Sequence, residues 1–329
     1  MPDDFYLFAP FRNAVPVRIS REEFAELKAA REAIVRLLEF EECYDLFARS
    51  FLRLEETLHD ITQKFLFPDS QNQNTTELFG DARERLNLEL ISFLTASAVL
   101  IEKGDRLAKN GVVPGFDKDT FEPIRTKLFD DHFEYRVMCG LRNFALHNKL
   151  PLGSISLDRK LEFENDAQAP DGLSRQRHSC NPTFLTADLI SDNSLRSETR
   201  KEIEGIGVEG LDVKFFVRRF VELLATRQFH IREMTDAGCK SSVAQFQDSV
   251  SKLSDKNNKE IEVIAVSTNG KPKELLGPFV IHVSRLTDSL SKRTKWQSLR
   301  NAVGSYVSGE IVDRASVYTV NPAAHFFPR

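Results

Sequence analysis

The sequence predicts a mainly α-helical protein, a bundle of long antiparallel helices with small β-hairpin insertions. Three observations support this fold class. Apolar residues recur at helical spacing over most of residues 20–150. Neither glycine nor proline interrupts residues 21–67. Short alternating or β-branched runs of the kind that form strands follow only after residue 151. Long helices joined by short loops pack as antiparallel neighbours.

The bulk composition is that of a globular protein with one large domain or two ordinary ones. The chain has 329 residues, of which 41% are apolar and 29% are charged. Its formal net charge is only −4. A nucleic-acid binder of the globally basic type is therefore excluded, and any such site has to be a local patch.

Targeting signals and cysteine patterns predict a cytoplasmic protein without a membrane segment. Residues 1–5 lack the basic start and apolar run of a signal peptide, and no stretch of 18 apolar residues occurs. The four cysteines are far apart and form no CxxC pair, so we expect neither a metal site nor a redox dithiol. They are Cys43, Cys139, Cys180 and Cys239.

The first half of the chain predicts an arm and three helices. The aromatic residues and prolines of 1–17 indicate an extended arm on the core. A capping box at Ser20–Glu23 begins a helix over 21–67, either straight or bent once. A second helix is predicted over 77–109 and a third over 118–148.

The second half predicts a mixture of short strands and helices. Alternation in 155–163 predicts a hairpin that turns at 158–160, followed by a polar loop over 165–182 and a short strand over 183–185. Further predicted elements are helices from about 195, over 211–234, over 237–254 and over 285–307, and paired strands at 261–266 and 279–283. The tail, 313–329, favours no particular structure.

The third predicted helix ends in residues suited to chemistry at a phosphate. Its last turns contain Arg142, Asn143 and His147. Histidine titrates near neutral pH and can accept or donate a proton. An arginine fork matches a phosphate and remains charged, and an asparagine can orient either group. We therefore take these three as candidate catalytic residues.

The motif consists of Arg142, Asn143, three further residues and His147. Its order and spacing resemble the ribonuclease motif of the HEPN superfamily. The resemblance covers about residues 20–150 and a later helix at 211–234. The resemblance implies a four-helix bundle that forms a homodimer. It implies a metal-independent, cofactor-free endoribonuclease that cleaves RNA by attack of the 2′-hydroxyl and leaves a cyclic phosphate. It also implies a setting in bacterial defence or a toxin system, in which a protein partner could regulate the enzyme.

The predicted elements divide the chain into three parts. Residues 1–150 would form the HEPN-like bundle with its N-terminal arm, and 151–193 a hairpin and loop insertion. Residues 194–329 would complete the bundle and add a small β-containing region. HEPN-like bundles without activity also exist, so the alternative is a non-catalytic module that binds RNA or a protein partner.

Helix geometry constrains how the motif can work. Arg142 and His147 lie roughly 140° apart around a helix, whereas Asn143 and His147 face the same way. Either Arg142 curls round the helix, or Arg142 of one copy works with His147 of another.

Other residues extend the predicted RNA-binding surface. His132 and Arg136 lie upstream on the motif helix, and a basic run surrounds an aromatic residue near the C-terminus. The alternative in each case is an ordinary solvated helix face, with the tryptophan buried. The members of the run are Lys292, Arg293, Lys295 and Trp296.

Overall fold

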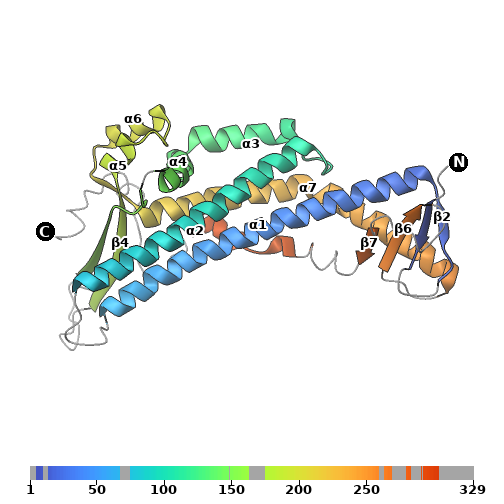
Figure 1. Cartoon of the computed structure of the whole chain (residues 1–329), viewed down its shortest axis with the longest axis horizontal. Coiled ribbons are helices and arrows are strands. Elements are labelled where there is room, and N and C mark those ends of the chain that lie inside the picture. Colours follow the sequence, from blue (N-terminus) through green and yellow to red (C-terminus); the bar gives the residue numbers. More distant parts are fainter. Residues whose placement is uncertain are drawn as a thin grey trace. The chain divides into compact units, whose positions relative to one another are not determined.

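The computed structural model is mainly helical with two small antiparallel sheets (Figure 1). It describes residues 5–9, 14–66, 75–147, 149–162, 175–258, 263–268, 279–282, 290 and 292–303. The α-helices in these ranges are α1 (Arg21–Leu66), α2 (Thr75–Asn110), α3 (Lys118–Asp131), α4 (Phe133–His147), α5 (Thr186–Ser191), α6 (Ser197–Ile206) and α7 (Val213–Asn257). The predicted mainly α class with small β elements is confirmed.

The strands of the described ranges form two sheets. They are β1 (Phe5–Phe8), β2 (Val17–Ile19), β3 (Ser154–Glu162), β4 (Arg175–Leu185), β5 (Gly210–Asp212), β6 (Val263–Thr268) and β7 (Phe279–His282). One sheet has the order β2-β1-β6-β7 and the other β3-β4-β5. The predicted pairing of the strands near 261–266 and 279–283 is confirmed for β6 and β7, which are antiparallel.

The chain divides into two compact units, and α1, α2, α3 and α7 each carry residues of both. Unit 1 consists of Met1–Asp45, Ile101–Ile124 and Arg227–Lys295. Unit 2 consists of Leu46–Leu100, Arg125–Thr226 and Trp296–Arg329. Each unit thus combines segments that are far apart in the sequence.

The start of α1 in unit 1 follows the predicted capping box. The Ser20 backbone N–H donates to Glu23 Oε2 (2.9 Å), and the Glu23 N–H donates to Ser20 Oγ (3.0 Å). Lys252 of α7 donates to the same carboxylate (2.6 Å). The lysine, followed by the Ser20 N–H, lowers the pKa of Glu23. One carboxylate therefore caps α1 and ties it to α7.

The sheet of unit 1 covers this pair of helices. Phe5 and Leu7 of β1 are buried with Leu27 and Ile34 of α1 and Phe246 of α7. The predicted extended arm is thus a paired strand in its described part.

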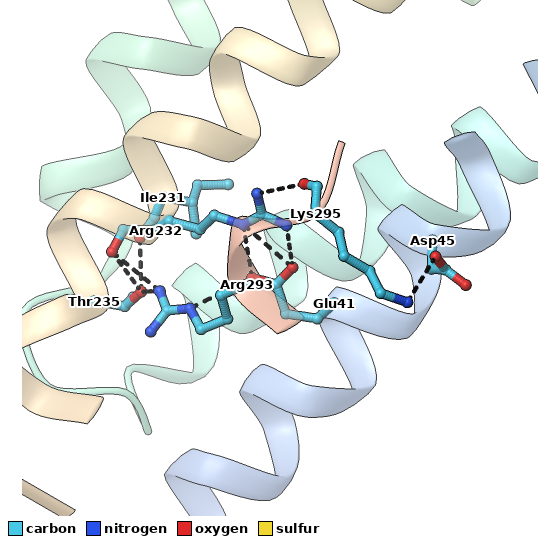
Figure 2. A network of polar contacts seen from close by, with 7 residues as sticks. All are labelled: Glu41, Asp45, Ile231, Arg232, Thr235, Arg293 and Lys295. Atoms are coloured by element: carbon cyan, nitrogen blue, oxygen red, sulfur yellow. Dashed lines mark hydrogen bonds and ion pairs between the residues drawn. The ribbon is translucent and has the colours of Figure 1, made fainter. Parts of the chain in front are cut away.

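A network of three charged residues links α1, α7 and the segment around Arg293 in unit 1 (Figure 2). Glu41 accepts hydrogen bonds from Arg232 Nη2 (2.6 Å) and Nε (3.0 Å), and Arg293 Nε lies 3.5 Å away. Arg293 Nη2 donates to Thr235 Oγ1 (2.6 Å), and Arg232 Nη1 donates to the Lys295 carbonyl (3.1 Å). The contacts attach the segment around Arg293 to α1 and α7.

One helix prediction near the C-terminus is wrong, and two others are confirmed as helix but belong to a single element. In the described part of 285–307 there are two 3₁₀ turns, Lys292–Thr294 and Gln297–Asn301, instead of a continuous α-helix. Trp296, which directly precedes the second turn, adopts a positive φ of 61°. The helices expected over 211–234 and 237–254 are one helix, α7, in which Thr235 Oγ1 bonds to the Ile231 carbonyl (2.7 Å).

Unit 2 is built around an aromatic cluster. The ring of Phe93 in α2 lies 5.6 Å from Phe47 and 6.4 Å from Phe51 in α1, and 6.2 Å from Phe220 in α7. Tyr135 of α4 lies 5.4 Å from Phe220. Four helices therefore share one apolar core.

Ion pairs show that α1 and α2 run antiparallel in unit 2, as predicted for the long helices. Arg85 bonds to Asp60 (2.6 Å), while Glu89, farther along α2, pairs with the earlier Arg53 (3.5 Å).

A break at His132 divides the predicted third helix of 118–148 into α3 and α4, so that prediction is wrong. The break leaves the last carbonyls of α3 without helical N–H donors. Arg136 replaces these donors by donating to the Phe129 and Asp130 carbonyls at 2.8 and 2.7 Å. Arg136 also pairs with Glu202 of α6 (2.6 Å).

The hairpin prediction for 155–163 is wrong as well. Residues 158–160 lie inside one strand, β3, which pairs with β4 from Ser154 opposite Thr183 to Glu162 opposite Arg175. The predicted loop of 165–182 is strand from Arg175 onward, and the predicted short strand at 183–185 is the end of β4. Period-two alternation indicates a strand but does not locate its turn.

A buried ion pair crosses the core of unit 2 from α7 to α1. Arg218 Nε and Nη2 donate to the two carboxylate oxygens of Glu55 at 2.6 and 2.7 Å. Both side chains are almost fully buried. Such a pair is costly to break, because the remaining charge stays desolvated.

We expect Glu55→Gln to lower the free energy of unfolding by about 3–5 kcal/mol, because it leaves the Arg218 charge buried and uncompensated. Urea unfolding measures the change. Lys240→Gln, which removes an exposed pair with Asp236, is the control and should cost less than about 1 kcal/mol. Equal effects of the two substitutions would contradict the prediction.

Candidate functional site at the end of helix α4

Apolar packing holds the helix that carries the predicted motif. Val137, Met138, Leu141 and Phe144 are all buried on one side of α4. At Gly140 the helix comes so close to the α5–α6 connection that a Cβ would lie 2.8 Å from Leu195 Cγ. Figure 1 shows α4 beside α5 and α6. The last turns of α4 therefore have a defined position within unit 2.

The predicted catalytic residues lie on the accessible part of this helix end. Asn143 and His147 are exposed, one helical turn apart, while Arg142 is partly buried. Asn143 and His147 thus face the same way, as their spacing requires. In one chain these two can act on a common ligand, whereas Arg142 lies roughly 140° round the helix from His147.

Two exposed leucines flank His147. The side chain of Leu146 is 59% exposed and that of Leu150 is 50% exposed, and both are large apolar groups. The helix end therefore combines polar groups suited to chemistry with apolar groups that a partner would bury.

The chain beyond α4 is held at several points. Lys149 Nζ lies 2.5 Å from Asp188 Oδ1 of α5. The Leu152 N–H donates to Asn87 Oδ1 (3.1 Å), and the Gly153 N–H donates to the Thr183 carbonyl (3.0 Å). Sequence reasoning did not select Lys149, although a lysine two residues after the histidine was a visible signal.

The structure separates the other predicted RNA-binding residues by environment. Arg136 is engaged with the end of α3 and with Glu202, so its guanidinium supports the fold. Arg293 is buried in the network of Figure 2. Lys295 is half-exposed and lies 3.8 Å from Asp45, and Trp296 is partly buried. The side chain of Lys292 lies outside the described residues.

His132 lies at the junction of α3 and α4, and its surroundings disfavour a positive charge. Burial, followed by Arg219 and to a smaller extent Lys127, lowers the pKa of His132 against the opposing influence of Glu134 and Asp131. We therefore assign to it a part in the helix junction.

Sequence reasoning missed a series of buried charges on α7. Besides Arg218, these include Lys214, which donates to Asn181 Oδ1, and Arg227, which donates to Asp105 (3.1 Å) and the Ile101 carbonyl (3.2 Å). The available signal was the position of Lys214 and Arg218 among phenylalanines and valines, four residues apart, on an otherwise apolar helix face.

Metal-type ligands do not gather in the described ranges, where no group of three histidine, cysteine or acidic residues could hold an ion. Burial raises the pKa of the Cys43 and Cys239 thiols, which disfavours a thiolate at either position. Across those same ranges, no helix is long and apolar enough to cross a membrane.

Comparisons with known proteins do not assign a family or a function to this chain. No protein-family model matches the chain, and neither a curated protein nor a solved structure matches it significantly.

We expect the stability of the protein to fall as the pH drops below the ordinary histidine pKa of 6.5, in part because of His132. Its pKa is lowered in the folded chain, so the unfolded chain binds the proton more readily and acid favours unfolding. Urea midpoints at about pH 7.5 and 5.5 should therefore differ less in His132→Gln than in the parent protein. An equal acid-induced loss in both proteins would remove His132 as a contributor.

Proposed function

We propose that the protein is an endoribonuclease whose site is the C-terminal end of α4, with Arg142, Asn143 and His147 as its reactive groups. The observation that carries this proposal is the exposure of Asn143 and His147 on one face of a firmly packed helix. Buried Leu141 and Phe144 fix the helix, so the polar groups can be held in position for a ligand.

The proposed reaction uses the ribose of the substrate as its nucleophile. The 2′-oxygen forms a bond to the adjacent phosphorus, and the bond from phosphorus to the 5′-oxygen breaks. His147 either takes the proton of the 2′-hydroxyl while water supplies one to the leaving 5′-oxygen, or supplies that proton while water takes the first. Arg142 stabilises the charge on the phosphate, and Asn143 orients the histidine or the phosphate. The products are a 2′,3′-cyclic phosphate and a 5′-hydroxyl, so the substrate must be RNA.

We further propose that the protein acts as a homodimer. Two observations support a second copy at this helix end. Arg142 and His147 point in different directions on one helix, so a second copy would supply the missing member of the pair. Leu146 and Leu150, next to His147, would be buried by such a copy. A cytoplasmic setting in defence or as a toxin, with a regulatory partner, belongs to the same proposal.

A non-catalytic binding module is the second candidate, and the exposed leucines favour it equally. In that case Leu146 and Leu150 would dock a different protein and His147 would be a surface residue.

We expect His147→Ala to reduce RNA cleavage in chelator by about 10²–10⁴-fold, the range for loss of a general acid or base. The measurement is the release of fragments with cyclic phosphate ends from cellular RNA. His59→Ala is the matched control, because His59 is also an exposed helix residue of unit 2, where it contacts Gln63. Equal activity of both variants would exclude His147, and intact RNA with all proteins would favour the binding module.

We expect Leu146→Glu to shift the protein from dimer to monomer, because a carboxylate would be desolvated in the proposed interface. Light scattering on a sizing column gives the mass. Leu88→Glu on α2 is the control, since Leu88 is also exposed and should tolerate the charge. A parent protein that is monomeric at all concentrations would refute the dimer.

A further inference from the structure

We propose that Lys149 is a second phosphate-binding side chain of the α4 site, and that Asp188 holds it until an RNA phosphate replaces the carboxylate. This inference rests on the proposed function. It adds a phosphate-binding residue that lies outside the motif and a carboxylate that competes with the substrate.

The position of the site at a helix C-terminus creates the need for another cation. The last carbonyls of a helix carry a partial negative charge, equivalent to about half an elementary charge. A phosphate beside His147 therefore meets a repulsive field from α4 itself. Arg142 lies roughly 140° round the helix from His147, so its charge is directed away from a phosphate on the histidine's face, and a further cation on that face would offset the field. Lys149, two residues beyond His147, is the next basic residue of the chain.

The present partner of Lys149 is suited to exchange. Nζ lies 2.5 Å from Asp188 Oδ1, with 49% of the lysine side chain and 28% of the aspartate side chain exposed. An ion pair in which both side chains are partly exposed to water contributes little to the stability of the fold. An RNA phosphate that approaches His147 can thus take the lysine from the carboxylate.

Asp188 is the fixed member of the pair. It lies in the first turn of α5, whose neighbouring Thr186 donates from Oγ1 to the Val208 carbonyl (2.6 Å) and from N–H to the Glu209 carbonyl (3.0 Å). Leu189, next to Asp188, is buried. The lysine, with its long flexible side chain, is therefore the group that moves toward a ligand.

A purely structural role for the pair makes a different prediction. If the ion pair only fastened the connection after α4, loss of either partner would disturb His147 in the same way. If the carboxylate competes with RNA, loss of the lysine and loss of the aspartate have opposite effects on affinity. The sign of the Asp188 effect therefore separates the two roles.

The test measures binding of the full chain to a fluorescent single-stranded RNA with 2′-O-methyl riboses, which cannot be cleaved by 2′-hydroxyl attack. Titrations run between about 50 and 200 mM salt. Lys149→Gln should weaken binding by about fivefold at 0.1 M salt and reduce the logarithmic salt slope by about 0.7, the value for one phosphate contact with a single strand. Asp188→Asn should strengthen binding by about two- to fivefold.

The controls separate this inference from the proposed function. Asp236→Asn and Lys240→Gln remove an exposed pair of similar length, 2.7 Å, on α7 and should leave affinity and salt slope unchanged. The double variant Lys149→Gln/Asp188→Asn should bind like Lys149→Gln, because Asp188 acts only through the lysine.

Each outcome has a defined meaning. If the parent protein binds RNA but Lys149→Gln keeps its salt slope, or Asp188→Asn weakens binding, the inference is overturned while the proposed function stands. If the parent protein neither binds the methylated RNA nor cleaves ordinary RNA, the proposed function fails and takes this inference with it.

Discussion

The packing of aromatic rings around Phe93 and Phe220 is the interaction on which the candidate site depends. It joins α1, α2 and α7 in one core, and Tyr135 attaches α4 to the same core through Phe220. Rings at these separations bury large apolar areas and constrain each other's orientation. Because α4 is short, this attachment, rather than its own helix propensity, determines where its last turn presents Asn143 and His147.

Charged groups within the core then restrict how the helices can pack. The two hydrogen bonds between Arg218 and Glu55 require one register of α7 against α1, since a shift by one residue would leave both buried charges unpaired. In unit 1, Glu41 has a comparable role toward Arg232 and Arg293 (Figure 2). Within the basic run near the C-terminus, Arg293 is therefore a buried partner of Glu41 and Thr235.

The position of the candidate site at a helix C-terminus has one favourable and one unfavourable consequence for binding a phosphate. A helix C-terminus supplies an exposed histidine near a bend of the chain, but its carbonyl ends disfavour the phosphate that the histidine would act on. A basic residue after the helix end would offset this effect, which is the role proposed for Lys149.

The sequence by itself determined the helical class, the capping box at Ser20, the lengths of α1 and α2, and the location of the candidate motif near the end of a helix. These features depend on contacts within a few residues, which periodicity and capping patterns record. Tertiary structure alone decided the break at His132, where Arg136 joins the end of α3 to the distant Glu202 of α6. It also decided that residues 158–160 continue a strand and that Arg293 is buried. Such outcomes arise from partners distant in the chain, and local pattern carries no information about them.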